Sequence, residues 1–280
     1  MTGARDWRGD VGDVWAREWR RTDRSLAPVN PALIAEATAR LAGLDAPRIL
    51  DIGCGAGATS LALAAALPEA RIMGIDLSAS LVAAARERAG ERPHLDFEVG
   101  DASSWTSDRA GFDLIVSRHG VMFFDDPVAA FRHLRTLLRP GGSLLFSCFR
   151  ARGENEWISA ARPLFERFAP EALTAPEPAV GPFAFADPDR IRSILGEAGF
   201  VPPHIVPLDF AFVAGAGEDP IADALAYFRS IGPIAVLLSS LDEPARKEAV
   251  EMLAGIAAAH LQCGEAAFAA AAWIVGSARP

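Results

Sequence analysis

The segment Asp51-Ile52-Gly53-Cys54-Gly55-Ala56-Gly57 restricts the possible folds of this chain more than any other. It ends a short apolar run and leads into residues 58–67, where leucines recur at helical spacing. Glycine at alternate positions lets the chain turn sharply out of a strand, and lets a ligand approach the backbone without meeting a Cβ atom. The segment therefore predicts a strand, a ligand-binding loop and a helix, as in nucleotide-type cofactor sites.

The same alternation of strands and helices continues along the chain. We predict further strands at residues 71–76, 95–99, 112–117, 143–149, 204–213 and 267–276, with helices at 78–89, 127–138 and 187–197 and a Pro-Gly-Gly turn at 140–142. Short links between such elements favour a parallel sheet covered by helices on both faces. Ligands of these sheets bind at the carboxyl ends of the strands.

The chain reads as a single α/β domain over residues 1–280. Residues 1–47 are predicted to form an N-terminal helical cap, and residues 48–150 a cofactor-binding core. Prolines and aromatic residues interrupt the rhythm at 151–187, which predicts an inserted helical lid. Residues 188–280 complete the sheet and carry a helical insertion at 219–260.

Composition and charge exclude several classes of function. With 36 acidic and 27 basic residues the formal net charge is −9, which argues against binding to nucleic acid or to an anionic membrane. The three cysteines are widely spaced, and no metal site is predicted. The N-terminus shows no export signal and no apolar stretch is long enough to span a bilayer, so we expect a cytoplasmic protein acting on a small molecule. The oligomeric state stays open, a homodimer included.

The glycine loop by itself leaves the cofactor undecided. Gly53, Gly55 and Ala58 also satisfy the G-x-G-x-x-G/A pattern of dinucleotide-binding enzymes. Asp51, however, would repel a pyrophosphate and attract a ligand that carries an ammonium and a sulfonium group. Asp76, at the end of the second predicted strand, suits either cofactor because it can accept hydrogen bonds from ribose hydroxyls.

Five motifs in order, DIGCGAG, GIDLS, GDASSW, FDLIVSRHGVMFF and LLRPGGSLLF, make the chain resemble the class I S-adenosylmethionine (SAM)-dependent methyltransferases. The resemblance covers roughly residues 15–149 and is to the small-molecule branch, which includes ubiquinone-biosynthesis-like enzymes with a methyltransferase type 11 domain. It implies a Rossmann-like, seven-stranded, mostly parallel sheet whose last strand is antiparallel and inserted between its neighbours. It also implies SAM as cofactor, S-adenosylhomocysteine as product, and in-line methyl transfer to O, N or C of a small organic acceptor.

The resemblance also assigns roles to individual residues. Asp51 would hold the methionyl ammonium, Asp76 the ribose and Leu77 the adenine, while Trp15 would lie on a helix that closes over the cofactor. The complete set of implied cofactor contacts is Trp15, Asp51, Gly53, Cys54, Gly55, Asp76, Leu77, Asp101, Ala102 and Ser117.

Candidate acceptor residues follow the fourth predicted strand and lie in the insertions. His119 is the candidate general base, because imidazole exchanges protons near neutral pH. Arg118, Met122, Phe183 and Tyr227 are candidates for the acceptor pocket. Arg118 could instead pair with Asp125 or Asp126, and the aromatic residues could be ordinary core.

Two other functions stay compatible with the sequence. A nicotinamide-dependent Rossmann oxidoreductase would use the same glycine loop, although Asp51 argues against it. A non-catalytic SAM-binding protein would carry the same cofactor motifs, because such motifs report binding and not transfer.

Overall fold

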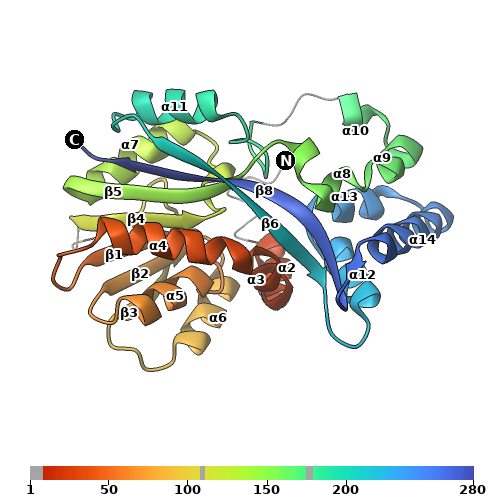
Figure 1. Ribbon diagram of the computed structural model, residues 1–280, viewed down its shortest axis with the longest axis horizontal. Helices are drawn as coiled ribbons and strands as arrows, with labels where there is room; N and C mark the ends of the chain where they lie inside the picture. The colour runs from red at the N-terminus through yellow and green to blue at the C-terminus, as the bar shows by residue number, and fades with distance from the viewer. Residues whose placement is uncertain (1–8, 108–110, 175–178) are drawn as a thin grey trace.

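The computed structural model describes residues 9–107, 111–174 and 179–280, and it confirms the predicted α/β sheet (Figure 1). Its strands run in the order β3-β2-β1-β4-β5-β8-β6, and a short β7 pairs with β8. The first five strands are parallel, whereas β8 is antiparallel to both β5 and β6, between which it lies. The bounds are β1 (Arg48–Ile52), β2 (Arg71–Asp76), β3 (Leu95–Val99), β4 (Phe112–Arg118), β5 (Leu138–Phe149), β6 (His204–Gly215), β7 (Leu261–Gln262) and β8 (Glu265–Ala278).

Helices cover both faces of the sheet, and each face has its own hydrophobic core. One core contains buried residues of α4 (Asn30–Arg40), α5 (Ala58–Ala66) and α6 (Ala79–Ala89), and the other those of α7 (Pro127–Leu137) and α11 (Pro188–Glu197). Successive strand residues point to opposite faces, so Ile49 joins the first core and Leu50 the second. Ser78 caps α6 by accepting a hydrogen bond from the Leu81 amide, as its position predicted.

Three groups of helices lie around the carboxyl ends of the strands. The N-terminal cap contains α2 (Asp10–Arg17), α3 (Trp19–Leu26) and the 3₁₀ turn η1 (Ala27–Val29). After β4 comes the short turn η2 (Val121–Phe123), and after β5 come η3 (Arg152–Glu154), α8 (Glu156–Ser159), α9 (Arg162–Phe168) and α10 (Glu171–Thr174). The insertion between β6 and β8 forms α12 (Pro220–Ser230), α13 (Gly232–Ser240) and α14 (Glu243–Ala259). In Figure 1, β6 and β8 reach past the other strands toward this insertion.

The prediction of a separate Pro-Gly-Gly turn at residues 140–142 is wrong, because these residues lie within β5. Strand β5 already begins at Leu138, which pairs with Phe112, and the pairing then shifts register before Leu114 meets Ser143. A Cβ atom on Gly142 would lie 2.9 Å from the carbonyl oxygen of Phe112. The two glycines therefore form an irregularity within the start of the strand: Gly141 has φ of +74°, and a side chain at Gly142 would clash with the neighbouring backbone.

Within the described ranges, no single helix has both the length and the apolar composition needed to cross a membrane. Helices α12 and α13 reach that length and composition jointly, across a bend of 75°.

Candidate cofactor and acceptor site

A cavity of about 450 Å³ opens at the carboxyl ends of the parallel strands, where ligands of such sheets bind. Its walls come from the N-terminal cap, the glycine loop, the segments after β2, β3 and β4, and the insertion between β6 and β8. The predicted site residues on its surface are Trp15, Asp51, Gly53, Cys54, Gly55, Asp76, Leu77, Asp101, Ala102, Arg118, His119, Met122 and Tyr227. One cavity thus brings together most of the predicted cofactor and acceptor residues.

The glycine loop needs glycine at its closest approach to a neighbouring loop. Gly53 has φ of +61°, and a Cβ atom there would lie 3.2 Å from the Cα atom of Gly120. The loop ends at Gly57, which has φ of +81° and precedes the first turn of α5. A side chain at Gly53 would be strained and would press on the loop after β4.

Asp51 is a buried carboxylate with one free oxygen. Its side chain is 1% exposed, and Oδ2 accepts a 2.5 Å hydrogen bond from the Ser60 hydroxyl. Oδ1 has no hydrogen-bond partner among the described residues. Burial raises the pKa of Asp51 to about 7, against the lowering effect of the Ser60 bond and of the Arg118 charge. A buried acceptor of this kind suits a cationic donor from a ligand.

Asp76 both shapes the loop and faces the cavity. Its Oδ2 accepts a 2.9 Å bond from the Gly55 amide, and Oδ1 accepts one of 2.9 Å from the Ser78 amide. Burial raises the pKa of Asp76, and these amide bonds oppose that effect. Each carboxylate oxygen has a second lone pair, so these bonds leave room for ligand hydroxyls.

Asp101 lies further along the same wall. Its Oδ1 accepts bonds of 3.0 Å from the Ser103 amide and 2.6 Å from the Ser103 hydroxyl. The carboxylate therefore closes its own turn while it lines the cavity with Leu77 and Ala102.

His119 is fixed by a hydrogen bond on one ring nitrogen. The residue follows β4 with φ of +59°, a conformation that side chains rarely adopt. Its Nδ1 lies 2.8 Å from the Ser147 hydroxyl, and its ring meets Phe149 edge-on at 4.3 Å between centroids. Nε2 has no partner within the described part of the chain. Burial, with a smaller contribution from Arg118, lowers the pKa of His119 to about 3, so the ring is neutral, and Nε2 is enclosed by the surrounding residues.

Arg118 forms an ion pair with Asp23, which lies far from it in the sequence. Its Nη2 lies 2.7 Å from Oδ1 of Asp23 on α3, so pairing with Asp125 or Asp126 is wrong. The other oxygen of Asp23 lies 2.8 Å from Nη1 of Arg88, whose guanidinium is 4.0 Å from the ring centre of Trp19. Asp23 therefore joins the N-terminal cap to both β4 and α6 beside the cavity.

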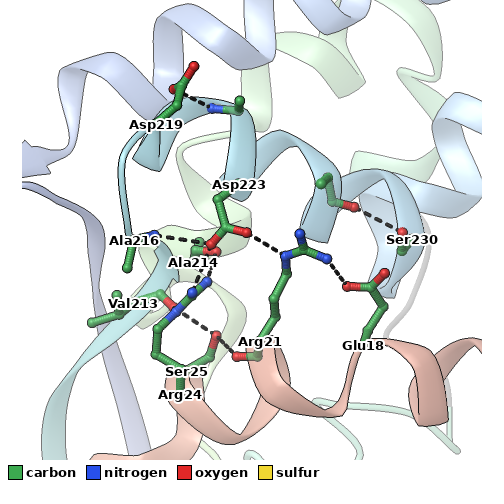
Figure 2. Close-up of polar contacts among 12 residues, drawn as sticks. Glu18, Arg21, Arg24, Ser25, Val213, Ala214, Ala216, Asp219, Asp223 and Ser230 are labelled. Carbon is green, nitrogen blue, oxygen red and sulfur yellow. Dashed lines mark hydrogen bonds and ion pairs between the residues drawn. The ribbon is translucent and has the colours of Figure 1, made fainter.

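A second ion-pair network joins the cap to β6 and α12 (Figure 2). Asp223 on α12 lies 2.6 Å from Nε of Arg21 and 2.8 Å from Nη1 of Arg24. Arg24 also donates to the carbonyl oxygens of Val213 and Ala214, at 3.1 and 2.6 Å. These contacts hold α3 against the end of β6.

Two predicted site residues do not line the cavity. Ser117 lies beneath it, where its hydroxyl donates to the Ile52 carbonyl at 2.8 Å and accepts from the Gly120 amide at 3.2 Å. Phe183 stacks on Trp157 at 5.7 Å between centroids, and Trp157 is the ring that reaches the cavity. The lid at 151–187 contributes only Trp157 and Pro182 to the wall among its described residues.

Sequence reasoning missed several residues of the wall: Thr22, Asp23, Phe149 and Phe212. Phe149 ends β5, so the rule that ligands meet carboxyl ends of strands could have found it. Phe212 lies near the end of an antiparallel strand, and Thr22 and Asp23 lie in a highly charged helix. No local pattern marks these three.

Comparison with known proteins agrees with this geometry. Residues 49–142 match the family model described as a methyltransferase domain. This match spans about a third of the chain and makes its cofactor-binding core similar to methyltransferase domains. A malonyl-[acyl-carrier protein] O-methyltransferase of Ilyobacter polytropus is 36% identical over 101 residues, covering 36% of this chain and 37% of that protein. A trans-aconitate 2-methyltransferase of Streptomyces coelicolor is 34% identical over 197 residues, covering 65% and 63%.

One solved structure shows a similar fold over nearly the whole of this chain. It is a phosphoethanolamine N-methyltransferase 2 of Haemonchus contortus in complex with phosphomonomethylethanolamine and S-adenosylhomocysteine. At 15% identity it aligns with a TM-score of 0.55, covering 97% of this chain and 60% of that one. The first curated relatives are covered over 37% to 63% of their own length. The match at residues 49–142 therefore favours a methyltransferase over the nicotinamide-dependent alternative.

Proposed function

We propose that this protein binds SAM in the cavity and transfers its methyl group to a small organic acceptor. The observation that carries the proposal is that Oδ1 of buried Asp51, at the start of the glycine loop, has no hydrogen-bond partner among the described residues. A dinucleotide pyrophosphate would bring negative charge to this carboxylate, whereas a methionyl ammonium would supply the missing donor.

The residues around Asp51 fit the rest of the cofactor. The carboxylate of Asp76 would receive the ribose hydroxyls, and Leu77, Asp101 and Ala102 would surround the adenine. Trp15 and Trp19 line the cavity from α2 and α3, so the N-terminal cap would close over the bound cofactor. Ser117 would act from below by holding the backbone of the loops at Ile52 and Gly120.

Catalysis of methyl transfer depends on how the protein positions the methyl donor and the acceptor more than on a nucleophilic side chain. SAM supplies a methyl group on a positively charged sulfur, which passes to a nucleophilic atom as the carbon–sulfur bond breaks and its electron pair stays on sulfur. The protein holds the acceptor in line and excludes water, which can lower the barrier by several kcal/mol, roughly 7 to 11 at best. The predicted role of His119 as a general base is not supported by its surroundings, because burial lowers its pKa to about 3 and so makes the ring a weak proton acceptor.

Two measurements test the proposal. Isothermal titration should show binding of S-adenosylhomocysteine to the purified protein and no binding of NADH. Incubation with methyl-labelled SAM and a set of small O, N and C acceptors should place label in a product. Absence of S-adenosylhomocysteine binding would overturn the proposal, and binding without transfer to any acceptor would favour a non-catalytic SAM-binding protein.

The names of two curated relatives specify malonyl-[acyl-carrier protein] and trans-aconitate, and trans-aconitate is a small starting acceptor for such a set. A compact acceptor is consistent with a cavity of about 450 Å³ shared with the cofactor. We also propose that the protein acts on a small molecule and not on a nucleic acid, because its composition is acidic. Its three widely spaced cysteines are consistent with the reducing cytoplasm.

A further inference from the structure

We infer that Arg118 binds the carboxylate of the cofactor's methionyl group, so that Arg118 and Asp51 together recognise an α-amino acid. The inference rests on the proposed function and moves Arg118 from the acceptor pocket, where the sequence placed it, to the cofactor. It depends on three features of the molecule: a buried donor without a partner, the contacts that hold this donor beside the glycine loop, and the scarcity of cations around the cavity.

Arg118 has a buried donor that no described protein group satisfies. Its side chain is 10% exposed and lines the cavity. Nη2 lies 2.7 Å from Oδ1 of Asp23, whereas Nη1 has no hydrogen-bond partner among the described residues. A charged donor buried in this state costs free energy, which an acceptor on a ligand would recover. An anionic oxygen is the strongest acceptor for a guanidinium.

The contacts of Asp23 hold this donor beside the glycine loop. The second oxygen of Asp23 lies 2.8 Å from Nη1 of Arg88, which also donates to the carbonyl oxygen of Ala56 in the loop. Arg88 and Arg118 therefore share one carboxylate, which leaves one positive charge of the three groups without a counter-charge. A ligand that lies on the glycine loop meets this charge.

Asp51 supplies the opposite half of the arrangement. Its Oδ1 also lacks a partner among the described residues, so this oxygen and Nη1 of Arg118 are not bonded to each other. The two side chains are nevertheless close enough for the Arg118 charge to lower the pKa of Asp51. An α-amino acid carries an ammonium and a carboxylate on one carbon atom, so a single group of the ligand would satisfy both side chains.

The cavity offers no second cationic side chain to a carboxylate. Among the described residues that line it, Arg118 is the sole lysine or arginine. Asp76 and Asp101 line the part of the wall that we assign to the ribose and the adenine, and they would repel a carboxylate there. The methionyl carboxylate of SAM therefore has one cationic partner within the described wall, and this partner is Arg118.

The test compares three ligands that differ only at the amino acid carbon. They are S-adenosylhomocysteine, S-adenosyl-3-thiopropylamine, which lacks the carboxylate, and S-adenosyl-4-thiobutyrate, which lacks the ammonium group. Isothermal titration of the wild type at pH 8 should show S-adenosylhomocysteine binding about 10- to 100-fold more tightly than the decarboxylated ligand, as expected for one charge-assisted contact. This comparison requires no variant.

A pair of variants then identifies the group that reads the carboxylate. Arg118→Gln should weaken S-adenosylhomocysteine and S-adenosyl-4-thiobutyrate by the same factor, about 10- to 100-fold, and should leave the decarboxylated ligand within about 3-fold of its wild-type affinity. Arg88→Gln is the matched control, because Arg88 pairs with the same Asp23 but does not line the cavity. It should keep the wild-type preference for the ligand with a carboxylate.

The outcomes distinguish this inference from the proposed function. If S-adenosylhomocysteine binds the wild type no more tightly than the decarboxylated ligand, the inference fails alone. It also fails alone if Arg118→Gln keeps the wild-type preference, and a raised KM for the acceptor in that variant would return Arg118 to the acceptor pocket. If none of the three ligands binds the wild type, the proposed function fails with it.

Discussion

Asp51 shows how one residue can be costly for folding and useful for binding. Its carboxylate is buried with a free oxygen, an arrangement that an amide would tolerate better than a charge. We expect Asp51→Asn to weaken S-adenosylhomocysteine binding at pH 8 about 30- to 100-fold, since a charge-assisted hydrogen bond contributes roughly 2–3 kcal/mol.

Isothermal titration at pH 8 measures this effect. Asp113→Asn is the control, because Asp113 is a partly buried carboxylate that pairs with Arg139 away from the cavity. It should bind the ligand like the wild type. Equal affinities for Asp51→Asn and the wild type would show that Asp51 does not hold the ammonium group.

Alanine substitutions at Gly53 and Gly43 distinguish the stability cost of backbone strain from an effect on ligand binding. Both have positive φ, +61° and +81°, so alanine at either position should cost about 1–2 kcal/mol of stability. Only at Gly53 would the new Cβ meet a neighbour, the Cα atom of Gly120 at 3.2 Å; nothing lies within 4 Å at Gly43. Gly53→Ala should therefore lose ligand binding at least 10-fold, and Gly43→Ala should keep it. Thermal melts should show a similar loss of stability for the two variants. Titration with S-adenosylhomocysteine should then show weaker binding for Gly53→Ala alone.

At the scale of elements, α3 is held over the cavity by polar contacts more than by apolar ones. Burial alone would raise the pKa of Asp223, but the bonds from Arg21 and the Ala216 amide and the Arg24 charge lower it. Asp223→Asn should weaken the attachment of α3 by about 1–2 kcal/mol and speed ligand dissociation several-fold.

Stopped-flow dissociation of S-adenosylhomocysteine at low and high salt measures this attachment. Asp189→Asn is the matched control, since Asp189 forms an exposed ion pair with Arg192 on α11 far from the cap. An unchanged dissociation rate for Asp223→Asn would mean that α3 does not have to move when the ligand leaves.

The elements also show why part of the site was predictable. The glycine loop and His119 follow β1 and β4, Asp76 is the last residue of β2, and local patterns identify both these strands and their ends. The aromatic side chains of the cavity wall have no such signal, because Phe149, Phe212 and Tyr227 meet only after β8 pairs with β5 and β6. Asp23 is similar, since its partners Arg88 and Arg118 are 65 and 95 residues away. Contacts of this range depend on the completed fold.

At the scale of the whole molecule, the cavity lies between the N-terminal cap and the insertion that precedes the last strand. The cap comes from residues 10–29 and the opposite wall from that insertion, and the parallel strands form the floor between them. Ligand binding should therefore stabilise the entire fold. At 100 times its Kd, S-adenosylhomocysteine should add about 2.7 kcal/mol and raise Tm by several degrees. Scanning calorimetry measures the shift, which Asp51→Asn should reduce at the same ligand concentration.

Two buried groups give opposite pH dependence to the stability of the ligand-free protein. Asp51 has a pKa near 7 in the folded protein against 3.8 ordinarily, so folding takes up a proton between these values and stability falls as pH rises. His119 has a pKa near 3 against 6.5, so stability falls as pH decreases from 6.5. Between pH 4 and 6.5 the two effects oppose each other at about 1.4 kcal/mol per pH unit each.

Replacing either Asp51 or His119 should reveal the pH dependence of stability that the other residue contributes. The free energy of unfolding of Asp51→Asn, relative to the wild type, should rise with pH by up to about 4 kcal/mol between pH 4 and 7. That of His119→Gln should fall by about 3 kcal/mol between pH 4 and 6.5. Urea denaturation at half-unit pH steps measures both differences, with Asp189→Asn as an exposed control parallel to the wild type. A parallel curve for Asp51→Asn would mean that the carboxylate is ionised in the folded protein at an ordinary pKa, and that its free oxygen is hydrated.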